Sequence, residues 1–148
     1  MRWRAAEERI VSKPRVLFLC TGNSCRSQMA EGWLRHLAGD RFEVFSAGTR
    51  PVGLDPNAVE AMREVGVDIS GHWSKHMSEC LGKEFSFVIT VCDAAAETCP
   101  ILPGAHQKLH WNFADPASAQ GSAEEKMAVF RRVRDEISAR TREFIAAD

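Results

Sequence analysis

The feature that most constrains the fold is an apolar segment that runs into a cysteine, a short turn and an arginine, reading C-T-G-N-S-C-R-S over residues 20–27. Residues 16–19 are all apolar, and the absence of alternation is typical of a parallel strand covered on both faces. After the turn, apolar residues recur at the spacing of an amphipathic helix: Ala30, Trp33, Leu34 and Leu37. We expect Gly39 to end this helix as a C′ glycine.

The turn between this strand and this helix is suited to holding an oxyanion. Backbone N–H groups at a helix start are unpaired, and with the helix dipole they favour a tetrahedral anion. We expect φ > 0 at Gly22 or Asn23, and the planar guanidinium of Arg26 can clamp two oxygens. Cys20 would lie at the floor, where these groups and the Ser27 hydroxyl would lower its pKa. The predicted oxyanion-binding residues are Thr21, Gly22, Asn23, Ser24, Cys25, Arg26 and Ser27.

Three further apolar segments predict strands at residues 42–46, 85–91 and 108–111. Helical segments lie between them and after them at short spacing. We therefore predict an α/β fold of the flavodoxin-like type, a single-domain three-layer sandwich. Its four-stranded parallel sheet would carry helices on both faces.

Local signals predict where helices begin and end. We expect Asp55 as an N-cap and Pro56 as the first residue of a second helix, which Gly66 ends. Ser122 with Glu125 forms a capping box for a last helix. The apolar face of that helix contains Phe130, Val133, Ile137, Thr141 and Phe144. A short helical turn is expected at residues 77–81.

Length and composition exclude several classes of protein. The 148 residues suit one domain, with residues 1–13 as an N-terminal extension and residues 14–148 as the domain. The net charge of −1, without a broad basic face, argues against nucleic acid as a partner. No apolar stretch approaches the roughly 18 residues of a membrane span, and the start of the chain lacks the apolar core of a secretory signal. The odd number of five cysteines then favours a reducing compartment, so we expect a cytoplasmic monomer.

Several motifs resemble those of a known family. C-T-G-N-S-C-R-S at residues 20–27, together with Asp115-Pro116, resembles the low-molecular-weight protein-tyrosine phosphatases. The rest of the pattern is similar to the thioredoxin-coupled arsenate reductases of that family. It consists of Q-M-A-E-G-W after the loop, S-A-G at 46–48, C-x6-C-P at 92–100, H-W-x-F-x-D-P at 110–116 and F-x-R-V-R-D-E-I at 130–137. The resemblance covers residues 15–144, most of the chain.

The resemblance implies a reaction and a set of catalytic residues: Cys20, Arg26, Cys92, Cys99 and Asp115. Cys20 would attack arsenate while Asp115 protonates the leaving oxygen. Cys92 would then attack Cys20 and release arsenite, and Cys99 would form a Cys92–Cys99 disulfide that thioredoxin reduces. Phosphate and sulfate are expected to mimic arsenate, weak aryl-phosphate hydrolysis is expected, and no cofactor or metal is implied. The helix-prone run A-A-A within residues 93–98 predicts a short helix that loosens on oxidation.

Other interpretations of the same residues remain open. Cys92, Cys99, His106 and His110 could ligate zinc, although their spacing fits structural zinc sites poorly. A tyrosine phosphatase is a second alternative, but Ala117 follows Asp115-Pro116 where these enzymes commonly carry tyrosine, and the chain has no tyrosine. A non-catalytic oxyanion-binding module is a third, and it would require Cys20 to be unreactive.

One position departs from the family pattern. Some relatives hold a potassium ion beside the loop with Asn, Glu, Ser and Asp, and Asn23, Glu31 and Ser46 match the first three. Lys75 stands where those relatives have Asp. Its ammonium could reach Glu31 and Asn23 or point into solvent, and both alternatives predict that potassium has no effect.

Three further side chains have simpler expected roles. We expect the side chain of Cys25 to point away from the loop, Cys80 to be a small core residue, and His36 to be solvated.

Overall fold

The computed structural model describes residues 13–80, 82–92 and 107–147. Its strands are β1 (Arg15–Cys20), β2 (Glu43–Gly48), β3 (Phe87–Thr90) and β4 (Gln107–His110). Its helices are α2 (Arg26–Ala38), α3 (Pro56–Glu64) and α5 (Ala123–Ala147), with 3-10 turns η1 (Met77–Cys80) and η2 (Pro116–Ser118). The strands form one parallel sheet in the order β2-β1-β3-β4. The predicted α/β fold with a four-stranded parallel sheet is confirmed.

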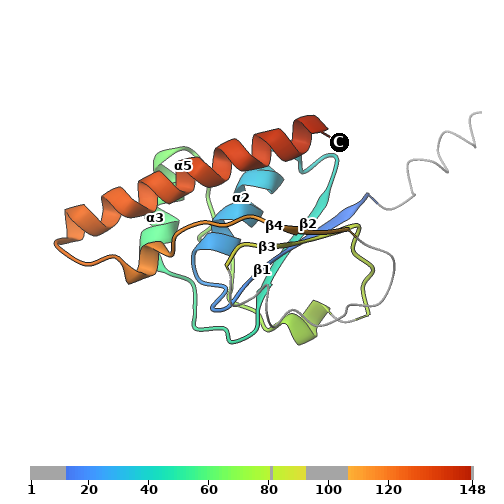
Figure 1. The fold of residues 1–148 in the computed structure, drawn as a ribbon, viewed down its shortest axis with the longest axis horizontal. Coiled ribbons are helices and arrows are strands. Elements are labelled where there is room, and N and C mark those ends of the chain that lie inside the picture. The colour runs from blue at the N-terminus through green and yellow to red at the C-terminus, as the bar shows by residue number, and fades with distance from the viewer. Residues whose placement is uncertain (1–12, 81, 93–106, 148) are drawn as a thin grey trace, which may run out of the picture.

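The central strand β1 is the most deeply buried part of the sheet. Residues 16–19 are fully buried, as their continuous apolar run predicts. β2 and β3 pair with β1 on its two sides, and Cys20 lies opposite Gly48 in the register. Figure 1 shows helices α2, α3 and α5 on one side of the sheet and the η1 turn on the other. Because all four strands run the same way, their carboxyl ends meet at one edge.

The helix signals are confirmed at three positions and wrong at a fourth. The Asp55 carboxylate accepts the N–H of Asn57 at 2.8 Å, and Ser122 and Glu125 exchange the two hydrogen bonds of a capping box. Gly66 follows α3 with φ 81°. Gly39 was expected to be a left-handed C′ residue, but its φ of −64° is right-handed helical. Helix α2 therefore ends at Ala38 without a left-handed residue.

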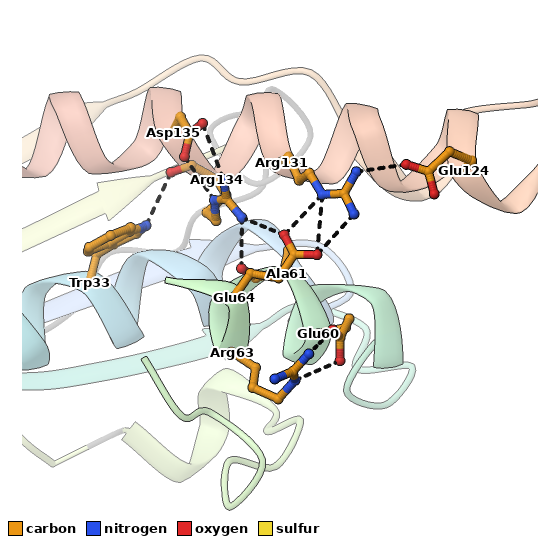
Figure 2. Close-up of polar contacts among 9 residues, drawn as sticks. All are labelled: Trp33, Glu60, Ala61, Arg63, Glu64, Glu124, Arg131, Arg134 and Asp135. Carbon is orange, nitrogen blue, oxygen red and sulfur yellow. Dashed lines mark hydrogen bonds and ion pairs between the residues drawn. The ribbon is translucent and has the colours of Figure 1, made fainter. Parts of the chain in front are cut away.

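Helix α5 lies across α2 and α3 and fixes them over the sheet. Its predicted apolar face is confirmed, because Phe130, Val133, Ile137 and Thr141 are at most 1% exposed. The guanidinium of Arg134 donates to the carbonyl of Ala61 at 2.9 Å and to Glu64 at 3.0 Å, and the Trp33 indole donates to the carbonyl of Arg134 (Figure 2). The first half of α5 is thus tied by polar contacts to both neighbouring helices.

No helix in the described part of the chain is long and apolar enough to cross a membrane.

Candidate active site

The loop between β1 and α2 has its left-handed residue at Asn23, with φ 47°. The alternative that Gly22 takes a positive φ is wrong. A Cβ on Gly22 would lie 3.0 Å from Cγ2 of Val52, so a larger residue would require the exposed Val52 side chain to shift by a few tenths of an ångström. This close contact, and not the backbone dihedral, favours glycine at this position.

The side chain of Asn23 is fully buried and holds the left-handed turn in place. Its Nδ2 donates to the hydroxyls of Ser27 at 2.8 Å and Ser46 at 3.0 Å. Its Oδ1 accepts from Nε2 of Gln28 at 3.0 Å and from the backbone N–H of Lys75 at 2.8 Å. These contacts use both amide hydrogens and both lone pairs of the oxygen. The turn is therefore fixed by β2, α2 and the segment before η1 together.

The carbonyl groups of the loop point toward a neighbouring segment. The carbonyls of Cys20, Thr21, Gly22 and Ser24 accept hydrogen bonds from backbone N–H groups within residues 49–55. In the described residues, no backbone N–H of residues 21–25 donates to a backbone acceptor. With the carbonyls engaged on one side, the N–H groups remain for the concave side, as in an anion-binding nest.

Arg26 lies at the start of α2 with a buried donor that has no partner. Its Nη1 donates to the carbonyl of Phe113 at 3.1 Å, and Nη2 lies 3.7 Å from Oδ2 of Asp115. Its Nε is buried and has no hydrogen-bond partner. An unsatisfied buried donor costs free energy unless a ligand accepts from it. This donor and the free loop N–H groups together fit a tetrahedral oxyanion.

Cys20 lies at the end of β1 and is 4% exposed. A hydrogen bond with Cys92 and burial both raise the pKa of the Cys20 thiol above 9.0, while the charge of Arg26 acts to lower it. The predicted lowering of this pKa is thus wrong for the arrangement in the structure. That prediction rested on the arginine and the loop N–H groups, and it left out the effect of burial and of Cys92 on this pKa.

Cys92 follows β3 and lies against the loop. It is 4% exposed, and its sulfur is 3.4 Å from the hydroxyl of Thr21. Neither it nor Cys20 is in a disulfide. The ends of β1 and β3, which pair in parallel, thus lie side by side at this edge of the sheet. Cys99 and the expected helix in residues 93–98 lie outside the described residues.

Asp115 follows β4 and reaches the same edge of the sheet. Its Oδ1 accepts the N–H of Ala117 at 3.0 Å, which caps the η2 turn, and Oδ2 faces Arg26. Cys25 was expected to point away from the site, but its sulfur lies 3.7 Å from Oδ1 of Asp115. This expectation is wrong. No sequence signal links these residues, because 90 positions separate them.

Lys75 points into the protein and not into solvent. Its Nζ lies 3.9 Å from Oε1 of Glu31 and donates to the carbonyl of Trp73 at 3.0 Å. Glu31 is itself buried, and it accepts from Ser46 and pairs with Arg35 at 2.7 Å. The ammonium therefore reaches Glu31, as the first alternative predicts, whereas the contact with Asn23 is made by the backbone N–H of Lys75.

The remaining side chains behave as expected where they are described. Cys80 is 3% exposed, and burial raises the pKa of its thiol. His36 is exposed. Among the described residues, no group of three or more His, Cys, Asp or Glu could hold a metal ion. Cys99 and His106, two of the four candidate zinc ligands, lie outside those residues.

Comparison with known proteins decides the family. Residues 15–147 match the model of the low molecular weight phosphotyrosine protein phosphatases. The chain belongs to this family. It is 53% identical over 129 residues to an arsenate reductase of Bacillus subtilis, an alignment covering 87% of this chain and 93% of that protein.

Solved structures of two arsenate reductases have the same fold. An arsenate reductase in a phosphate-binding state superposes with a TM-score of 0.75 at 31% identity, covering 90% of this chain and 98% of that one. A thioredoxin-dependent arsenate reductase of Corynebacterium glutamicum gives a TM-score of 0.71 at 30% identity, covering 97% of this chain and 65% of that one.

Proposed function

We propose that this protein is an arsenate reductase that reduces arsenate to arsenite in a cysteine relay. The observation that carries the proposal is a second buried thiol at the oxyanion loop: Cys92 follows β3, and its sulfur lies 3.4 Å from the hydroxyl of Thr21, the residue next to Cys20. A phosphatase needs one thiolate, an arginine and an acid. A second thiol beside the first can deliver two electrons to a bound centre that accepts them, as As(V) does and phosphorus in phosphate does not. The arsenate reductases among the relatives support the same assignment.

The first step is nucleophilic attack. The loop N–H groups and Arg26 hold arsenate over Cys20, whose sulfur forms a bond to arsenic. The As–O bond opposite breaks, and Asp115 gives its proton to the leaving oxygen. Arsenic remains As(V) in this step. The contact of Asp115 with Arg26 supports its assignment as the acid, since both then face the same ligand.

The second step is reduction. The Cys92 thiolate attacks the sulfur of Cys20, and the electron pair of the S–As bond stays on arsenic, which leaves as arsenite. A Cys20–Cys92 disulfide remains. The Thr21 hydroxyl at 3.4 Å can orient the attacking sulfur. Cys99 then displaces Cys20 from Cys92, and a thioredoxin reduces the Cys92–Cys99 disulfide.

Weak hydrolysis of aryl phosphates is proposed as a side activity, because the loop, Cys20 and Asp115 are also the parts that a phosphatase of this family needs. Water would release phosphate from Cys20, and Cys92 would take no part.

The proposal is tested by arsenite production with a thioredoxin system, compared with glutathione and glutaredoxin. Cys20→Ser should abolish arsenite production and aryl-phosphate hydrolysis together, since both begin at that sulfur. Cys80→Ser is the matched control, because it removes another buried thiol outside the loop. Turnover retained in Cys20→Ser, or arsenite formed faster with glutaredoxin, would overturn the corresponding part of the proposal.

A further inference from the structure

Cys25 occupies the N-cap position of α2 but does not cap the helix. An oxygen-bearing side chain at this position usually accepts the N–H of the second or third helical residue. The side chain of Cys25 makes no such bond, although it is 3% exposed. Its sulfur accepts from the Ser24 hydroxyl at 3.7 Å and lies 3.7 Å from Oδ1 of Asp115. Its contacts are directed at the acid and not at the helix.

The two oxygens of Asp115 have different surroundings. Oδ1 accepts the N–H of Ala117 at 3.0 Å and faces the Cys25 thiol, whereas Oδ2 faces Nη2 of Arg26 at 3.7 Å. Because Ser24 donates to the sulfur, the S–H hydrogen is free to point at Oδ1. When the carboxyl group is protonated, the oxygen that accepts both hydrogen bonds serves as its carbonyl oxygen, and the proton is then on Oδ2.

We propose that Cys25 is a positioning residue for the acid. Its thiol holds Oδ1 of Asp115, so that Oδ2 carries the proton and faces the leaving oxygen. The inference rests on the acid role proposed above for Asp115. As the bond from Cys20 to the central atom forms and the bond to the leaving oxygen breaks, the proton moves from Oδ2 to that oxygen. No electrons are transferred in this step.

A thiol suits this position better than a hydroxyl for two reasons. A serine oxygen would compete for the N–H groups of Ser27 and Gln28, which lie at the helix start that the oxyanion needs. Sulfur is a weak acceptor and leaves them available. Burial raises the pKa of the Cys25 thiol from 9.0 to about 11. It therefore stays protonated as a donor near neutral pH and does not compete with Cys20 as a nucleophile.

The test is a double-mutant cycle of Cys25→Ala and Asp115→Asn, read with two aryl phosphates. Phenyl phosphate has a poor leaving group that needs an acid, and 2,4-dinitrophenyl phosphate has a good one that does not. The ratio of the two kcat/KM values reports the step in which the aryl group leaves, because both substrates give the same phosphorylated Cys20, and it is independent of how much variant enzyme is folded. We expect Cys25→Ala to lower the phenyl-to-dinitrophenyl ratio about three- to fivefold, as for loss of one weak hydrogen bond, and not to lower it further in the Asp115→Asn background.

Cys25→Ser completes the experiment. It keeps a donor, so the ratio should stay close to that of the wild type, while inhibition by inorganic phosphate should weaken because the new oxygen competes for helix N–H groups. An unchanged ratio in Cys25→Ala, or an equal fall of the ratio in both backgrounds, would overturn the inference. The assignment of Asp115 as the acid would then still stand. An unchanged ratio in Asp115→Asn, or no hydrolysis by the wild type, would overturn the acid assignment and the inference with it. Arsenite production is measured separately and reports on the proposed function.

Discussion

The two thiols at the sheet edge influence each other's protonation. The hydrogen bond of the Cys20 thiol with Cys92 is the largest cause that raises the pKa of Cys20, burial is the next, and Arg26 opposes both. Cys20 must nevertheless lose its proton to act as a nucleophile. The contact between Cys20 and Cys92, which places the two reacting sulfurs side by side, thus also favours the protonated form of Cys20.

Replacing Cys92 with alanine should lower the pKa of Cys20, because it removes the largest raising cause and leaves Arg26 in place. The midpoint of the pH profile for iodoacetamide alkylation of Cys20, followed by mass spectrometry of its peptide, should therefore move to lower pH. Cys80→Ala is the control and should leave the midpoint unchanged. A midpoint that stays or rises in Cys92→Ala would contradict this account.

Lys75 places a fixed positive charge next to buried Glu31. We infer that this ammonium takes the place of the potassium ion that the sequence resemblance implies beside Asn23, Glu31 and Ser46. Potassium should therefore neither raise the melting temperature of this protein nor increase its rate of arsenate turnover. Melting temperature and arsenate turnover should agree in matched potassium and sodium salts at constant ionic strength.

Lys75→Asp is the variant that should create a potassium response, since Asn23, Glu31 and Ser46 are already arranged around the site. A potassium-specific gain in the wild type would show that Lys75 does not replace the ion.

At the scale of elements, the buried contacts of one arginine connect α5 to α3. The Arg134 side chain is 10% exposed and donates to Glu64 and to the carbonyl of Ala61 (Figure 2). Arg131, one turn earlier, also pairs with Glu64 but is 36% exposed. The two residues share a partner and differ in burial, so they form a matched pair.

Arg134→Met should lower the free energy of unfolding by about 2–3 kcal/mol, because the Ala61 carbonyl and Glu64 lose buried donors. Arg131→Met should lower the free energy of unfolding clearly less, since water can solvate the exposed carboxylate that loses its ion pair. Urea denaturation of both variants measures the difference. Equal losses of unfolding free energy in the two variants would show that the burial of Arg134 adds nothing to the stability that its charge provides.

Some local features of these elements, such as helix caps, could be predicted from the sequence, and others, such as the left-handed turn, could not. Asp55 and Ser122 were identified as caps because capping depends on residues a few positions away. The choice of Asn23 over Gly22 for the left-handed turn depends on Ser46 and Lys75, which are distant in sequence. Local preference alone could not decide between the two.

For the whole molecule, parallel topology was the strongest prediction. In the structure this topology brings Cys20, Cys92 and Asp115 to one edge of the sheet. The side-chain contacts within that edge were not predictable. Thr21 and Cys92 are 71 positions apart and meet only through the pairing of β1 with β3. The sequence therefore identifies the parts of the site, and the fold determines which of them touch.

The central claim is that Cys92 resolves an arsenylated Cys20, and a single turnover of Cys99→Ser tests it most directly. This variant should release about one arsenite per enzyme and accumulate a Cys20–Cys92 disulfide, detected as a linked peptide by mass spectrometry. Cys92→Ser should release none and retain arsenic on Cys20. Arsenite release by Cys92→Ser, or release by Cys99→Ser without that disulfide, would contradict the account.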